Sequence, residues 1–292
     1  MAKEKETNSV KNAKGFLMSN LGSDSLWRDF KTITHGESLD WVTSYIGNLL
    51  LDVDSSLDEL TKTAEIISQR QNEDGGWAYN HKFFSDTDST AFTILFLSHY
   101  GEKYKGALKK AEEFLLQHQR TTGGFATYNE KEVRRYYRIP EEMSVRGWCR
   151  EIPEVTATAV RALRKLKKNS EVKRGISYLI KQQNESGKWK SYWWNSDIYS
   201  TVQTIMALGQ HEVVEKAQEW ITQKDNSVPE APFYFALSLI GILGNKNYFK
   251  EVERKVERLL STQKEDGSWE TYPILRFPHP SNIKPWNDPN TW

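Results

Sequence analysis

The sequence contains a single cysteine and no long apolar run, and each shortage excludes a class of protein. Cys149 alone can form neither an internal disulfide nor a thiolate zinc cluster. No run approaches the ~18 apolar residues of a membrane-spanning helix, and the polar N-terminus has no apolar core of signal-peptide length. We therefore expect a cytoplasmic protein.

The chain also lacks an excess of either charge. Its 292 residues carry 40 basic and 39 acidic side chains, for a net charge of +1, and the two signs are interspersed. Such a charge pattern gives no field that would attract nucleic acid, so we expect no nucleic-acid partner. Aromatic residues, by contrast, are abundant. The 11 tryptophans indicate a core built on large rings or an aromatic-lined cavity.

A short motif recurs along the chain in units of about 40 residues, with some insertions. Each copy reads Gln, a polar spacer with Gly, and an aromatic ring, and a fifth copy at 223–229 keeps only the Gln. The complete copies are QNEDGGW (71–77), QRTTGGF (119–125), QNESGKW (183–189) and QKEDGSW (263–269). An amphipathic helical pattern precedes each copy, and a more apolar one generally follows it. The repeating unit is therefore a pair of helices.

The alternation of amphipathic and buried helices predicts an all-α fold. A stack of helix pairs exposes its ends unless it is capped or closes on itself. We therefore expect a single α/α toroid, an α6–α6 barrel of about five to six helix-pair repeats, whose inner helices begin on one face. We assign residues 1–25 to a mobile tail, 26–276 to the toroid and 277–292 to a Pro/Trp-rich strap. Exposing Trp286 and Trp292 of this strap would be costly.

The stretch FFSDTDSTAF (83–92) places two aspartates just before an inner helix. Asp86 has acidic counterparts in two other repeats, Glu154 and Asp197, which favours helix capping or chemistry at the rim of the ring. Asp88 has no such counterpart, so capping does not account for it. The residues that align with Asp88 in other copies are Trp41, Thr156 and Tyr199.

The repeated motif resembles the QW motif of the terpene cyclase and prenyltransferase superfamily, over roughly residues 38–275. The QW motif is structural, so the resemblance implies no chemistry for its Gln and Trp residues. The run DTDSTA at 86–91 resembles the D-x-D-D-T-A motif of class II cyclases, with Ser89 at the last aspartate. This implies that Asp88 is the general acid, with Asp86 and Ser89 as its hydrogen-bonded neighbours.

The resemblance implies a class II-type terpene or meroterpenoid cyclase. Such an enzyme protonates an alkene or epoxide of a linear isoprenoid or prenylated small molecule and so starts ring closure. Ring faces stabilise the carbocations that follow. Candidate cavity-lining rings near the inner-helix starts are Trp41, Tyr45, Trp148, Trp193, Trp194, Tyr199, Phe233 and Tyr234. Core packing is the alternative role for each ring.

The sequence has neither a D-D-x-x-D motif for magnesium-assisted ionisation nor a D-x-C motif for zinc. We therefore expect no metal and no cofactor in the protonation step, although magnesium could help to hold a diphosphate head group. Larger class II cyclases have two toroids, whereas this chain has room for one. Either one ring works alone, or a homodimer or second toroid subunit completes the site. Peripheral contact with a membrane is a further expectation.

Two other functions fit the same pattern. A non-catalytic toroid could bind a hydrophobic ligand or a partner protein. Sugar-active toroids use paired carboxylates, which Asp40, Asp86, Glu154 and Asp197 could supply around one rim. The position of Asp88 separates the enzyme from the binder. A dry aromatic cavity around Asp88 favours an acid, whereas a helix cap facing solvent favours a binding protein.

Overall fold

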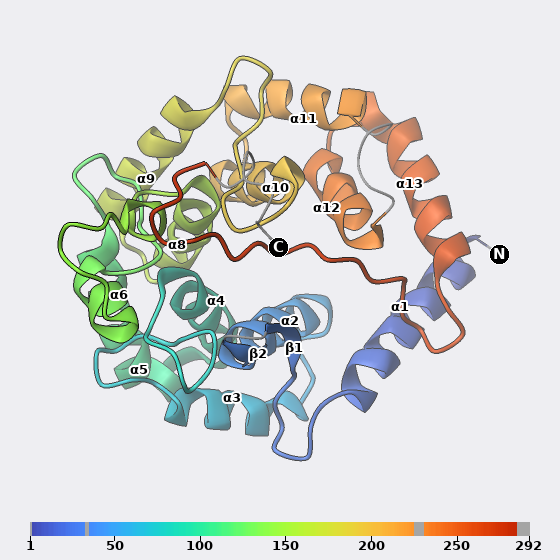
Figure 1. The fold of residues 1–292 in the computed structure, drawn as a ribbon. Coiled ribbons are helices and arrows are strands. Elements are labelled where there is room, and N and C mark those ends of the chain that lie inside the picture. Colours follow the sequence, from blue (N-terminus) through green and yellow to red (C-terminus); the bar gives the residue numbers. More distant parts are fainter. Residues whose placement is uncertain (1, 33–34, 225–230, 285–292) are drawn as a thin grey trace.

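The computed structural model describes residues 2–32, 35–224 and 231–284, in which helices form two concentric layers (Figure 1). The inner layer consists of α2 (Asp40–Val53), α4 (Thr87–Leu97), α8 (Pro153–Lys165), α10 (Asp197–Leu208) and α12 (Pro232–Ile242). The outer layer consists of α1 (Ala2–Ser19), α3 (Leu60–Gln69), α5 (Lys105–His118), α9 (Asn169–Gln182), α11 (Glu212–Lys224) and α13 (Phe249–Thr262). The predicted all-α toroid is confirmed.

Side-chain burial distinguishes the two layers. In the inner helix α4, every residue except Asp88 is buried. The outer helix α9 buries only Val172, Gly175, Tyr178 and Leu179 and exposes its charged face. This difference follows from the sequence, because α4 is apolar or small at most positions, whereas α9 has apolar residues only at helical spacing.

Motif turns connect neighbouring helices through a recurring set of hydrogen bonds, which is complete in the first and third complete copies. In the third complete copy, the Gln183 side-chain amide donates to the carbonyl of Val213, in the next outer helix α11, at 2.8 Å. The Trp189 indole donates to the carbonyl of Leu179, near the end of α9, at 2.6 Å. The Trp189 backbone N–H donates to the Thr201 hydroxyl of the inner helix α10 at 3.1 Å. The motif therefore fixes where each inner helix begins.

The glycine of the motif permits this close contact. Gly187 has a φ of +94°, a region that side-chain-bearing residues rarely adopt. A Cβ atom at this position would lie 2.4 Å from the carbonyl oxygen of Lys216 in α11. Any larger residue would therefore strain the turn and push it away from the neighbouring outer helix.

The same contact closes the ring between its last and first outer helices. The Gln263 amide donates to the carbonyl of Ser9 in α1 at 3.0 Å, and Lys14 of α1 forms an ion pair with Asp54 at 2.8 Å. Residues 1–25, which the sequence analysis assigned to a mobile tail, are described from residue 2 onward. Most of this segment is α1, which completes the outer layer because the Gln263 side chain holds it there.

A further copy of the motif, which the sequence pattern did not reveal, follows α1. It ends at Trp27, whose indole donates to the carbonyl of Leu17 at 2.7 Å and whose backbone N–H donates to the Thr43 hydroxyl at 2.9 Å. These are the same two bonds that Trp189 makes. The copy escaped notice because Leu21 stands where the other copies have Gln.

Among the described residues, the inner layer has no sixth helix between α12 and α2. The chain after α13 instead runs in extended form across the ring (Figure 1). A two-stranded antiparallel hairpin, β1 (Asp29–Thr32) and β2 (Gly36–Ser38), lies beside α2. The space that a sixth inner helix would fill is therefore left to the hairpin and the extended segment.

The extended segment, here called the strap (residues 270–284), begins before the expected boundary at residue 277. Its backbone bonds to the loop before α10, where the Arg276 N–H donates to the Trp193 carbonyl at 2.7 Å. Further along, the Trp148 indole donates to the carbonyl of Pro278 at 2.8 Å. The expectations for Trp286 and Trp292 concern positions outside the described residues.

The insertion between the second and third complete motif copies holds two short helices, α6 (Glu130–Tyr137) and α7 (Arg146–Cys149). Two 3₁₀ helices, η1 (Ser98–Tyr104) and η3 (Lys246–Tyr248), lead into outer helices α5 and α13. In the described part of the chain, every helix is too short or too polar to cross a membrane.

We predict that Gln263→Ala lowers the free energy of unfolding by about 1–3 kcal/mol, because two buried or partly buried carbonyls lose their donor. Urea denaturation measures the change. Gln182→Ala is the matched control, since Gln182 is exposed at the end of α9. Equal stability of the two variants would contradict a role of Gln263 in closing the ring.

Candidate active site

Asp86 is the N-cap of α4, as its counterparts in other repeats suggested. Its backbone is extended, and its two carboxyl oxygens accept from the Ser89 N–H at 2.7 Å and the Ser89 hydroxyl at 2.6 Å. Its own N–H donates to the Trp77 carbonyl at 2.9 Å. Asp86 and Ser89 therefore bond to each other, whereas both were expected to bond to the Asp88 side chain, and the backbone N–H of Asp88 also lies close to the Asp86 carboxyl.

Asp88 lies two residues further along the chain, in the first turn of α4, and has different neighbours. Its Oδ2 accepts from the Trp41 indole N–H at 2.7 Å. The Thr158 hydroxyl donates to the carbonyl of Glu154 at 3.0 Å and lies near enough to the Asp88 carboxyl to affect its pKa. The buried Oδ1 of Asp88 has no hydrogen-bond partner within the described residues. That oxygen is available to carry a proton to a bound molecule.

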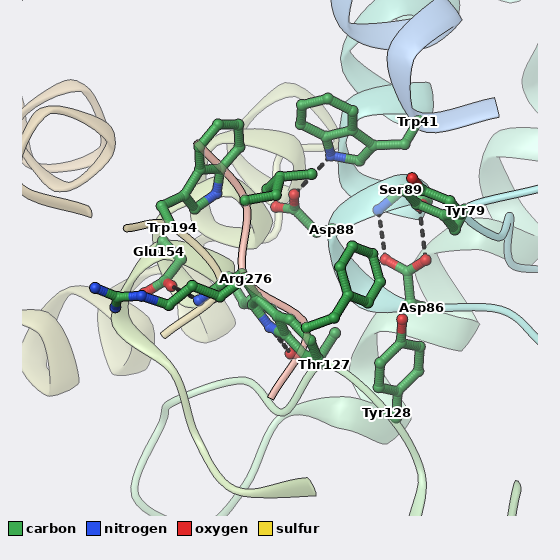
Figure 2. A pocket seen from close by; sticks show the side chains of 14 residues that line it. Trp41, Tyr79, Asp86, Asp88, Ser89, Thr127, Tyr128, Glu154, Trp194 and Arg276 are labelled. Atoms are coloured by element: carbon green, nitrogen blue, oxygen red, sulfur yellow. Dashed lines mark hydrogen bonds between the residues drawn. The ribbon is translucent and has the colours of Figure 1, made fainter. Parts of the chain in front are cut away.

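Asp88 faces a small cavity of about 70 Å³, here called the acid pocket (Figure 2). In this view the indole rings of Trp41 and Trp194 stand on either side of the Asp88 carboxyl. The acid pocket combines aromatic walls with three carboxyl groups. Its main lining residues are Trp41, Trp193, Trp194, Phe277, Asp86, Asp88 and Glu154.

A larger cavity of about 850 Å³, here called the chamber, occupies the gap between α2 and α12. It shares Trp41, Leu275 and Phe277 with the acid pocket, so the two cavities adjoin. The chamber is within the ~300–1,000 Å³ that is usual for small-molecule sites. It is lined by α2, the hairpin, the start of α12 and the strap.

The eight predicted rings divide into two groups. The rings that line a cavity are Trp41, Trp193 and Trp194 in the acid pocket, and Trp41, Tyr45 and Phe233 in the chamber. The other three rings line neither cavity and pack behind the residues that do: Trp148, Tyr199 and Tyr234. Tyr199 stacks on Trp194 with ring centroids 3.7 Å apart, and the Tyr234 hydroxyl donates to the Ile274 carbonyl at 3.1 Å.

Several residues at the site were not candidates from the sequence. Thr158 and Arg161 lie within α8, and no motif marks them. Arg276 comes from the strap, far from Asp88 in the chain. Glu154 was named from the sequence only as a counterpart of Asp86 and as a rim carboxylate. The structure aligns it with Asp88 instead, because the Phe125 N–H donates to Thr156 as the Trp77 N–H donates to Thr90.

Burial raises the pKa of all three carboxyl groups at the acid pocket. The pKa of Asp88 rises to about 6, against the opposing effects of Trp41, Thr158 and the charge of Arg161. The pKa of Asp86 rises to about 7 despite its bonds from Ser89. Burial likewise raises the pKa of Glu154 to about 7. Carboxyl groups with such shifts can hold protons near neutral pH, as general acids require.

Metal ligands do not gather at the site in the described part of the chain. No group of three or more His, Cys, Asp or Glu side chains there could hold a metal ion.

The chain resembles known cyclases in sequence and in fold. A family model for the squalene-hopene cyclase C-terminal domain matches residues 78–229, just over half of the chain. The squalene–hopene cyclase of Bradyrhizobium diazoefficiens is 27% identical over 247 residues, which cover 70% of this chain and 37% of that protein. The drimenyl diphosphate synthase of Streptomyces showdoensis is 22% identical over 216 residues, covering 72% of this chain and 32% of that protein. The chain thus spans about a third of the length of these curated relatives.

A solved structure covers much more of the chain. The type II terpene cyclase MstE from Scytonema matches with a TM-score of 0.89 at 24% identity, over 98% of this chain and 88% of that chain. A variant of MstE has been solved in complex with geranylgeranyl dihydroxybenzoate as substrate. At this level of identity, the likeness shows that the two proteins share a fold.

We predict that Asp86→Asn reduces the loss of stability with rising pH. The folded state holds the Asp86 proton up to about pH 7, whereas the unfolded state releases it near pH 4, so stability falls as pH rises between these values. Asparagine cannot ionise and avoids this cost. Urea unfolding at pH 4.5 and 7.5 should show a decrease smaller by about 2–4 kcal/mol than in the wild type.

Asp24→Asn is the control for this measurement. Hydrogen bonding to Arg28 lowers the pKa of Asp24, so this group titrates below the pH window. Asp24→Asn should leave the change in stability between pH 4.5 and 7.5 as it is in the wild type. An unchanged pH dependence in Asp86→Asn would show that Asp86 is ionised throughout this range.

Proposed function

Because the chain belongs to the family of squalene-hopene cyclase C-terminal domains, we propose that it is a class II-type terpene or meroterpenoid cyclase. In this proposal the protein binds a linear isoprenoid, protonates its terminal alkene or epoxide, and guides the resulting cation through ring closure. The fold is compatible with many functions, so the proposal depends on the acid pocket.

One observation carries the proposal: the Asp88 carboxyl, with a buried and unpartnered Oδ1, borders an aromatic cavity. Proton transfer leaves an Asp88 carboxylate. The Trp41 indole N–H, which donates to Oδ2 at 2.7 Å, stabilises that anion, as does the positive charge of Arg161. The donor and the charge are both in place before the reaction, so they favour proton transfer without rearrangement.

The walls of the acid pocket suit the cation that protonation creates. The indole rings of Trp41, Trp193 and Trp194 and the ring of Phe277 surround the space in front of Asp88. Aromatic faces attract a cation without bonding to it. A wall of rings also excludes the water that would capture the cation.

The two adjoining cavities suggest how the substrate lies. The acid pocket holds about 70 Å³, enough for only the end of an isoprenoid, whereas the chamber holds about 850 Å³. The terminal double bond or epoxide would reach Asp88, and the rest of the chain would pass Trp41 into the chamber. The gap in the inner layer thus provides the volume for the substrate.

The charges around the chamber favour a prenylated small molecule over an isoprenoid diphosphate. Among the described residues that line it, Lys31 is accompanied by two carboxylates, Asp29 and Glu270. A diphosphate usually needs several cationic partners or a bound magnesium ion. No step of the proposed mechanism passes through magnesium. The prenylated benzoate bound by the MstE variant is a molecule of the favoured kind.

We predict that Asp88→Asn lowers the rate of conversion by at least ~10³-fold, because asparagine has no acidic proton to transfer. The assay incubates the protein with geranylgeranyl dihydroxybenzoate, geranylgeranyl diphosphate and squalene, and mass spectrometry follows the cyclised products. Asp197→Asn is the matched control. It alters a carboxylate at the start of α10 that pairs with Lys188 and Lys190 outside both cavities.

The outcomes separate the cyclase from the other candidate functions. Full conversion by Asp88→Asn would reject Asp88 as the acid. A wild-type protein that binds these compounds and returns them all unchanged would instead be a ligand-binding toroid. Loss of activity in Asp197→Asn as well as Asp88→Asn would favour a general effect on folding, which circular dichroism would detect.

A further inference from the structure

The acid pocket contains a second carboxyl group at the end of the substrate where the reaction starts. Glu154 stands two residues before a threonine that accepts from the backbone N–H of a motif aromatic residue, as Asp88 does in its own repeat. Both side chains line the acid pocket, to which the proposed function assigns the initiating end of the isoprenoid (Figure 2). We propose that this end is preferentially an epoxide, whose oxygen takes the proton of Asp88 and accepts a hydrogen bond from Glu154. The inference rests on the proposed function and selects between its two initiating groups.

Backbone donors hold the Glu154 side chain in one orientation. Its Oε1 accepts from the N–H of Tyr192 at 2.5 Å and from the N–H of Trp193 at 3.0 Å. Its Oε2 is buried and has no hydrogen-bond partner among the described residues. One oxygen is therefore fixed by the loop before α10, and the other is available to a molecule in the acid pocket.

The protonation state of Glu154 in the reactive enzyme follows from that of Asp88. Asp88 must be protonated to act as the acid, and burial raises its pKa to about 6. Burial raises the pKa of Glu154 to about 7, so Glu154 holds its proton at every pH at which Asp88 does. Because Oε1 already accepts from two amides, this proton resides on Oε2. The reactive enzyme therefore presents a buried O–H donor that needs an acceptor.

The charged groups near Glu154 leave its Oε2 without a partner. Arg150 opposes the rise in the pKa of Glu154, and its guanidinium donates to two backbone carbonyls at 3.2 Å. Arg276 lines the acid pocket and donates to the Asn195 carbonyl at 3.1 Å. In the part of the chain that the structure describes, neither guanidinium bonds to Oε2. The acceptor must therefore come from the bound molecule.

An epoxide supplies this acceptor, and an alkene does not. The lone pairs of an epoxide oxygen can receive the hydrogen bond from Glu154, whereas an alkene end presents only carbon and hydrogen. An alkene would leave the O–H group buried without a partner, which costs the desolvation of that group. The third carboxyl of the pocket, Asp86, makes no such demand, because both of its oxygens accept from Ser89.

The weak acidity of Asp88 favours the same initiating group. Ser89 occupies the place of a further aspartate in the motif that this run resembles, and its hydroxyl bonds to Asp86. With a pKa raised to about 6, Asp88 is a weaker acid than an ordinary aspartic acid. An epoxide oxygen is more basic than an alkene carbon, so a weak acid protonates it more readily.

The chemical step balances without any other reactant. The O–H bond of Asp88 breaks and an O–H bond forms on the epoxide oxygen, which leaves an Asp88 carboxylate. One C–O bond of the epoxide breaks, and its electrons remain on the oxygen, which becomes a hydroxyl. The carbon so released is the cationic centre that the next double bond attacks. Glu154 keeps its own proton and stabilises the oxygen throughout.

The test measures kcat/KM for two matched pairs of compounds: geranylgeranyl dihydroxybenzoate with its terminal epoxide, and squalene with its terminal monoepoxide. Mass spectrometry and NMR identify the cyclised products. Glu154→Leu removes the donor, and Glu154→Gln keeps an N–H donor together with the acceptor for the two amides. Glu151→Leu is the control, because Glu151 lies three residues away and bonds to Thr122 outside the acid pocket.

We expect the wild type to convert each epoxide with a kcat/KM at least tenfold above that of its alkene, to a product with a hydroxyl at the initiating end. Glu154→Leu should lower kcat/KM for the epoxides at least tenfold and leave the values for the alkenes within threefold. Glu154→Gln should stay within threefold of the wild type for the epoxides. Glu151→Leu should match the wild type for all four compounds.

Other results would overturn the inference. A wild type that converts the alkenes as efficiently as the epoxides would reject the epoxide and leave the cyclase proposal standing. Equal losses for epoxides and alkenes in Glu154→Leu would give Glu154 a structural role alone and reject its hydrogen bond. No conversion of any of the four compounds by the wild type would reject both the inference and the proposed function.

If Glu154→Leu does not fold, the pH profile of Glu154→Gln provides the test. Both carboxyl groups must be protonated in the wild type, so log(kcat/KM) for an epoxide should fall with a slope of about −2 as pH rises above both pKa values. Glutamine does not ionise, so only Asp88 titrates in the variant and the slope should be about −1. A slope that stays at its wild-type value in Glu154→Gln would reject the donor role of Glu154.

Discussion

The ring depends on one recurrent contact, the hydrogen bond from a glutamine side-chain amide to a backbone carbonyl of the next outer helix. Gln71, Gln119, Gln183 and Gln263 all make it, with donor–acceptor distances of 2.8, 2.9, 2.8 and 3.0 Å to the neighbouring helix. The last of these bonds joins α13 to α1 and so closes the layer. The side-chain NH₂ group of glutamine can donate to two carbonyls at once, one in its own turn and one in the neighbouring outer helix, which explains why glutamine is used.

This contact also decides where the chemistry can occur. In the first three complete copies the backbone N–H of the motif's aromatic residue donates to a threonine of the following inner helix, as Trp77 does to Thr90 at 2.9 Å, so these inner helices start at the same face. Asp88 and Glu154 occupy such starts in adjacent repeats. Because the described residues supply six outer but five inner helices, the ring encloses a chamber rather than a filled core.

The acid pocket works against the stability of the fold. Three carboxyl groups lie in surroundings that raise their pKa values to about 6 or 7, so the protein loses stability when they ionise. Such a cost is typical of sites that must transfer protons. The surrounding indole rings impose the cost, because they exclude water, and they also suit a cationic intermediate.

The sequence by itself determined the toroid, the motif turns and the position of Asp88, because these follow from local spacing: a glutamine six residues before a ring, and an acid at a helix start. It could not reveal that α1 completes the outer layer, since Leu21 replaces the glutamine of that copy. Tertiary structure alone decided that Trp41 bonds to Asp88, 47 residues away, and that Arg276 enters the same pocket. Contacts between distant segments depend on how the ring closes, and no short pattern records that geometry.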